Sequence, residues 1–116
     1  MKNKKDKEYE TFYYGEGGVY VGKFKGYDKH GFGTYTFVTG EEYSGEWVND
    51  KRTGHGVHTW PDGDKWEGEW KNNSRHGRGT MTYANGMWRT GIWENDECVS
   101  IEDDSEKPSF LKREID

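Results

Sequence analysis

Four histidines are the residues of this 116-residue chain whose type could bind a metal ion or move a proton. His55 and His58 are three residues apart on an expected strand, so they point to opposite faces of a sheet. His30 and His76 stand at equivalent places in two similar segments, and a strand spacing of about 4.8 Å puts them roughly 20 Å apart. We therefore expect no metal site.

The hydroxyl, thiol and carboxyl groups form no catalytic pattern either. No serine stands in a G-x-S-x-G sequence, the strained turn that exposes a nucleophile in hydrolases. The single cysteine, Cys98, follows Glu97, an acidic setting unlike that of a reactive thiolate, and it has no partner for an internal disulfide. The acid pairs Glu41-Glu42 and Asp103-Asp104 are expected to be solvated. The G-x-G pairs begin strands, so they are not phosphate loops. We expect neither catalysis nor a cofactor.

Composition favours a sheet covered with aromatic rings. Only 29% of the residues are hydrophobic, yet 16% are aromatic and 17 are glycine. Such a chain cannot build an aliphatic core, but it can pack rings on one face of a sheet with glycine beneath them. The net charge of −5 disfavours nucleic acid as a partner. No apolar run suggests a signal peptide or a membrane span, so we expect a cytoplasmic protein.

The sequence repeats with a period of 23 residues. One column of the repeat contains Gly22, Gly45, Gly68 and Gly91. Aromatic residues stand two positions later, at Phe24, Trp47, Trp70 and Trp93, and two positions earlier, at Tyr20, Tyr43 and Trp66. A third aromatic column, Phe37, Trp60 and Tyr83, precedes Gly40, Gly63 and Gly86. Each repeat is therefore one structural unit that packs on its neighbours.

Residues alternate with a period of two inside each unit, which predicts half-buried strands. Thr39-Gly40, Asp62-Gly63 and Asn85-Gly86 are expected to form the short hairpin turns, with glycine at positive φ. The segments 26–29, 49–52 and 72–75 are expected to be longer connections. The fold class predicted is all-β: an elongated, single-layer antiparallel meander of stacked hairpins over residues 9–97.

The two ends differ from the repeats. Residues 1–8 are basic and are expected to be flexible. Residues 98–116 are expected to form an acidic linker and a short amphipathic helix, in which Leu111 and Ile115 share one face after Pro108. The fourth unit keeps Gly91 and Trp93 but has Arg89 in place of the ring, as a terminal cap would.

The pattern Y-x-G-x-W, then G-x-G and a closing glycine, resembles the MORN repeat (membrane occupation and recognition nexus). Three full units, at 20–40, 43–63 and 66–86, carry the resemblance, and His30 and His76 match the family's histidine where the middle unit has Thr53. The resemblance implies a non-enzymatic scaffold, often in cytoskeletal or ciliary assemblies such as radial spokes. It also implies two alternatives: a module for anionic phospholipid, and a regulatory subunit of a separate enzyme.

The aromatic columns are the predicted partner-binding site, because a single-layer sheet has no second layer to cover its rings. Exposed rings of this kind mark binding sites. This aromatic groove consists of Tyr20, Phe24, Phe37, Tyr43, Trp47, Trp60, Trp66, Trp70, Tyr83 and Trp93.

A basic column, Lys29, Arg52 and Arg75, is the candidate site for lipid or an acidic partner. Each cation near an anionic surface contributes about 1 kcal/mol. The alternative interpretation is that these side chains solvate turns and protect the sheet from aggregation.

Overall fold

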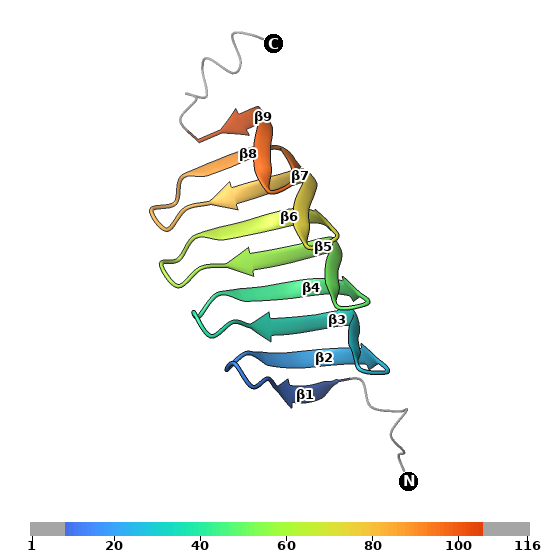
Figure 1. Cartoon of the computed structure of the whole chain (residues 1–116). Helices are drawn as coiled ribbons and strands as arrows, with labels where there is room; N and C mark the ends of the chain where they lie inside the picture. Colours follow the sequence, from blue (N-terminus) through green and yellow to red (C-terminus); the bar gives the residue numbers. More distant parts are fainter. Residues whose placement is uncertain (1–8, 106–116) are drawn as a thin grey trace, which may run out of the picture.

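The computed structural model describes residues 9–105, which form one antiparallel sheet of nine strands in chain order (Figure 1). The predicted all-β meander is confirmed, and its length of 62 Å is more than twice its other dimensions of 29 and 25 Å. No helix is present within residues 9–105, so none there could cross a membrane. The strands are β1 (Glu10–Tyr13), β2 (Val19–Lys25), β3 (Asp28–Thr36), β4 (Glu42–Val48), β5 (Lys51–Thr59), β6 (Lys65–Lys71), β7 (Ser74–Thr82), β8 (Trp88–Glu94) and β9 (Glu97–Asp104).

A track of paired glycines crosses the sheet beneath the rings. Gly22 pairs with Gly33, Gly45 with Gly56, and Gly68 with Gly79 on adjacent strands. The rings of Tyr20, Tyr43 and Trp66 lie over these three pairs and are 0% exposed. The absence of Cβ atoms along the track lets each ring lie directly on the backbone, which is how one layer buries large side chains.

Tryptophans join these rings into a continuous core. The ring of Trp47 meets Tyr20 edge to face at a centroid distance of 5.7 Å and meets Tyr43 at 5.1 Å. Trp70 packs in the same way between Tyr43 and Trp66. The indole N–H of Trp47 donates a hydrogen bond to the carbonyl of Gly33 at 3.0 Å. Trp47 and Trp70 therefore each connect their own repeat to the one before it, and such edge-to-face pairs stabilise the fold beyond simple burial.

Each of the strands β3, β5 and β7 begins with a short arm that leaves the sheet plane. Figure 1 shows these arms running along one side of the array toward the following hairpin. The arm of β5 ends at Gly54, whose φ of 64° bends the strand into the sheet.

Two hydrogen bonds hold each arm to the next turn. In the arm of β5, the amide of Arg52 donates to Oδ1 of Asn73, and the amide of Asn73 donates back to the carbonyl of Arg52. Lys29 with Asp50, and Arg75 with Asp96, make the same two bonds. The arms therefore connect adjacent repeats through residues that are 21 positions apart.

The relative lengths of the two kinds of turn are the reverse of the prediction. Only Asn49 and Asp50 separate β4 from β5, and both have positive φ, at 49° and 69°. Asn and Asp tolerate this conformation, so they form a two-residue hairpin turn, and the residues after them belong to the arm. The expected short turn at Thr39-Gly40 lies in a connection of five residues, 37–41, with Gly40 at positive φ as predicted.

The sheet also extends beyond its predicted end. Residues 98–104, expected to be an acidic linker, lie in β9, where Cys98 pairs with Trp93 and Ile101 with Gly91. Strand β8 would otherwise present unpaired backbone groups, and β9 satisfies them. The basic segment 1–8 and the predicted helix with Leu111 and Ile115 lie outside the described residues.

Candidate binding site

The rings of the predicted aromatic groove divide into a buried set and an accessible set. Six of the ten form the core of the sheet and offer a partner almost no surface: Tyr20, Tyr43, Trp47, Trp66, Trp70 and Trp93. Phe24, Phe37 and Trp60 are partly buried against that core, and Tyr83 is 36% exposed. The accessible rings Phe37, Trp60 and Tyr83 belong to one column of the repeat, and we call them the outer ring row.

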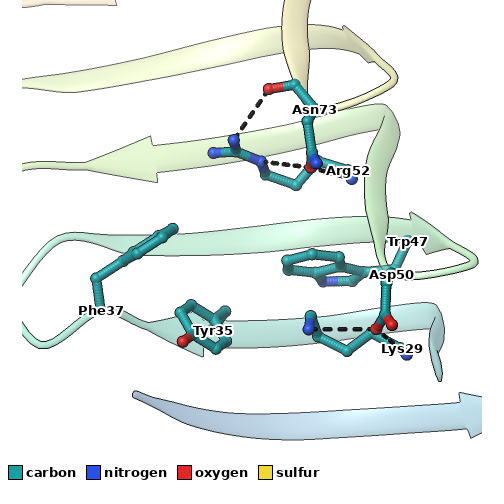
Figure 2. Close-up of a pocket in the computed structure, with 7 residues that line it drawn as sticks. All are labelled: Lys29, Tyr35, Phe37, Trp47, Asp50, Arg52 and Asn73. Carbon is teal, nitrogen blue, oxygen red and sulfur yellow. Dashed lines mark hydrogen bonds and ion pairs between the residues drawn. The ribbon is translucent and has the colours of Figure 1, made fainter. Parts of the chain in front are cut away.

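A hollow of about 210 Å³ opens on the ring face between the first two full repeats. In Figure 2, Phe37 lies on one side of this hollow, Lys29 and Asp50 lie on the other, and Tyr35 and Trp47 lie between them. Arg52 of the second repeat and Asn73 of the third complete the lining. The site thus combines an aromatic floor with charged and amide groups from the arms and turns.

Lys29 lies over the rings and is not at a free edge. Its ammonium group is 5.1 Å from the ring centroid of Trp47 and 5.3 Å from that of Tyr35. It also forms an ion pair with Asp50 at 3.3 Å, and its side chain is only 13% exposed. Burial alone would raise the pKa of Asp50, but hydrogen bonds and the charge of Lys29 outweigh burial and lower it. The pair is a charge-neutral part of the lining.

Arg52 and Arg75 are held in the same way one and two repeats later. The guanidinium of Arg52 lies 4.6 Å from the ring centroid of Trp70, and that of Arg75 lies 5.8 Å from the centroid of Trp66. Arg75 is 3.2 Å from Oδ1 of Asp96 and is 20% exposed. The three cations of the predicted basic column therefore lie at equivalent places in successive repeats, but their side chains stack on the rings and bind the next turn.

Tyr35 and His58, which are not among the predicted partner-binding residues, pack against Phe37 and Trp60 of the outer ring row. They occupy the same column, two positions before Phe37 and Trp60, so the period-two alternation could have revealed them. Burial raises the pKa of Tyr35 to about 12, and its hydroxyl donates to Glu16 at 2.6 Å.

His58 is buried within the aromatic cluster. Its ring centroid lies 4.5 Å from that of Trp60, and its Nε2 is 2.9 Å from Oε1 of Glu41. Burial lowers the pKa of His58 even though Glu41 acts in the opposite sense. Its Nδ1 is buried without a hydrogen-bond partner. The imidazole is therefore held neutral next to the outer ring row.

His55 lies on the opposite face of the sheet, as the alternation predicts. Its Nε2 is 3.0 Å from Glu67, and its Nδ1 is 3.4 Å from Glu69. The hydrogen bond to Glu67 is the main cause that raises the pKa of His55. Within residues 9–105, no three His, Cys, Asp or Glu side chains are grouped so that they could hold a metal ion.

These features define a class of protein: a linear array of β-hairpins whose rings pack on glycine pairs. The family model of the MORN repeat matches residues 20–42, 43–65 and 66–88, the three full units of the sequence. The chain belongs to the MORN-repeat family. Repeats of this family are generally associated with binding of proteins or membrane lipids. A search of curated proteins found no match to the chain.

Proposed function

We propose that this chain is a non-enzymatic scaffold subunit that holds an extended segment of a protein partner against its ring face. The observation that carries the proposal is the outer ring row, Phe37, Trp60 and Tyr83. These residues repeat along the sheet beside a buried aromatic core and keep accessible surface. Aromatic side chains on a rigid support are typical binding hot spots, because they bury much area and lose little entropy.

An extended protein segment fits this face better than a membrane does. The three cations of the basic column are stacked on rings and bonded to the next turn, with exposures of 13% for Lys29 and 20% for Arg75. A bilayer is flat and approaches cations that project from a surface, whereas a chain segment can enter a recess. The cytoplasm, within a cytoskeletal or ciliary assembly, is the setting that we propose from the family resemblance.

The proposal is tested by paired substitutions on the two faces of one repeat. Phe37→Gln combined with Trp60→Gln removes two rings of the outer ring row, and Phe32→Gln removes a ring that is 43% exposed on the opposite face. Capture of binding proteins by the full chain should be lost with the double substitution and kept with Phe32→Gln. Tyr43 and Trp66 are not suitable sites for this test because both are fully buried, so changing them would report on folding.

The protein-segment proposal also predicts how the chain behaves toward lipid. Co-sedimentation with vesicles containing anionic lipid should be weak at physiological salt for the full chain, and it should not depend on Phe37 or Trp60. Strong sedimentation that persists in the Phe37→Gln, Trp60→Gln chain, together with equal protein capture by all variants, would contradict the protein-segment proposal.

A further inference from the structure

The two-residue turns that hold the three arms differ from one another at one position. The turn that holds each arm places Asp50, Asn73 or Asp96 at the same place in the repeat, with nearly equal φ values of 69°, 74° and 70°. All three side chains accept the amide hydrogen bond of the arm residue at 2.8–2.9 Å. Only Asn73 does so without a negative charge. Lys29 and Arg75 therefore have a carboxylate partner, and Arg52 has an amide.

Arg52, one of the residues that line the hollow, has unused hydrogen-bonding capacity. Its Nε donates to Oδ1 of Asn73 at 3.2 Å, and its Nη2 donates to the Asn73 carbonyl at 2.9 Å. A guanidinium has five N–H groups, so both of Nη1 and one of Nη2 remain. Figure 2 shows the third nitrogen of Arg52 pointing away from Asn73. No carboxylate of residues 9–105 forms an ion pair with this side chain.

The charge of Arg52 is also poorly solvated. Burial lowers its pKa, while the more distant charge of Asp96 acts in the opposite sense. Rings of Trp70 and Tyr43 lie 4.6 and 5.7 Å from the guanidinium carbon and fix its orientation. Lys29 and Asp50 neutralise one another in the same hollow. The lining therefore has one excess positive charge, carried by a side chain whose orientation is already set.

We propose that the hollow binds the carboxylate of an Asp or Glu side chain in the partner's segment, at the free Nη1–Nη2 edge of Arg52. This inference rests on the proposed function and names the chemistry of the partner. A planar guanidinium edge matches the two oxygens of a carboxylate, and such charge-assisted pairs are about twice as strong as neutral ones. A neighbouring apolar side chain of the segment lies against Phe37 and Tyr35, which line the same hollow.

The geometry favours a carboxylate on a peptide over phosphate on a lipid or in solution. The carboxylate of Asp50 lies in the lining, and its negative charge repels a dianionic phosphate more than a monoanionic carboxylate. The side chain of an Asp or Glu residue can enter the hollow, whereas a headgroup fixed in a bilayer approaches only cations that project from the surface.

The repeat itself supplies the test variant. In Asn73→Asp, the new carboxylate should keep the backbone bonds of the turn, because Asp50 and Asp96 make them with the same φ. It should also neutralise Arg52 from within the chain. Asp96→Asn is the matched control, because it removes a carboxylate from the equivalent place at Arg75 and leaves every residue that lines the hollow unchanged.

The experiment selects peptides from a random twelve-residue library on the full-length chain and on its Asn73→Asp variant. Peptides selected by the unmodified chain should share an Asp or Glu next to an apolar residue. Replacing that acid by its amide should weaken binding about tenfold, the effect of losing a charged hydrogen bond. Asn73→Asp should weaken binding equally without lowering the thermal midpoint, and the two changes together should cost no more than one. Asp96→Asn should bind at least as tightly as the unmodified chain, because it removes a distant negative charge that partly offsets that of Arg52.

The outcomes of the peptide selection distinguish a failure of the carboxylate site from a failure of the scaffold proposal. Selected peptides without a shared acid, or full affinity of the Asn73→Asp chain, would overturn the carboxylate site and leave the scaffold proposal standing. Displacement of the peptide by millimolar inorganic phosphate or by vesicles of phosphatidylserine would assign the site to phosphate groups instead. Enrichment of no peptide at all would overturn both proposals.

Discussion

The ring of Trp66 lies directly over Gly68 and over its cross-strand partner. A Cβ atom on Gly68 would fall 2.7 Å from Cη2 of Trp66, 2.6 Å from Cα of Gly79 and 2.5 Å from the carbonyl oxygen of Arg78. Two of these three atoms belong to backbone, which cannot move without disrupting the sheet. The glycine at this position is therefore required by the burial of the ring above it.

We expect Gly68→Val to lower the free energy of unfolding by about 2–3 kcal/mol or more, the scale of overpacking. Glu69→Val, one residue later on the opposite face, should cost less than about 1 kcal/mol because that side chain is exposed. Urea denaturation of both variants measures the difference. Equal losses would mean that the assignment of faces is wrong.

The bonds between arms and turns predict a second pair of effects. Asp50→Ala removes the side-chain acceptor of the Lys29 amide and places alanine at a φ of 69°. We expect a loss of about 2 kcal/mol from these two causes. Asp50→Asn keeps the acceptor and the turn, as Asn73 does in the next repeat, and should cost less than about 1 kcal/mol.

The thermal midpoints of the two Asp50 variants, measured at 0.15 M salt, provide the comparison. Equal destabilisation by both would assign the effect to the ion pair with Lys29 and would contradict the role given to the backbone bonds.

His58 makes stability depend on pH. Its folded-state pKa is lowered by burial, so the unfolded chain binds more protons than the folded chain once the pH falls below about 6.5. Stability is therefore complete above that pH and declines as the pH falls toward the lowered pKa. His55 acts in the opposite direction because its pKa is raised by Glu67.

The two histidines are separated by comparing His55→Gln with the His55→Gln, His58→Gln double variant. The thermal midpoint of the single variant should fall more between pH 7.5 and pH 5.5 than that of the double variant. Identical slopes would show that His58 is not held neutral in the folded state.

The repeat and the alternation were sufficient to predict the sheet, its strand order and the two faces. They could not predict how deeply the rings are buried. Tyr43 lies flat on Gly45 and Gly56 and is covered by Trp47 and Trp70, and this depends on the mutual orientation of rings from two repeats. A ring column in a sequence is equally consistent with a core and with an open groove.

The candidate site was only partly predictable for a similar reason. Phe37, Trp47, Lys29 and Arg52 were selected from their columns, whereas Asn73 and its contact with Arg52 were not. That contact depends on the bend at Gly54, which carries the arm out of the sheet toward the next turn. No local pattern specifies this direction, because the two residues that meet are 21 positions apart.

Photo-crosslinking from the two faces of one strand region tests the central claim, that a protein segment binds the ring face. The photoreactive residue p-benzoylphenylalanine replaces Phe37 in the outer ring row or Phe32, 43% exposed on the opposite face, so both changes start from the same side chain. Irradiation in cells should give a protein adduct of defined mass from position 37 and none from position 32. An adduct from position 32 alone, or the same adducts from both positions, would contradict binding at the ring face.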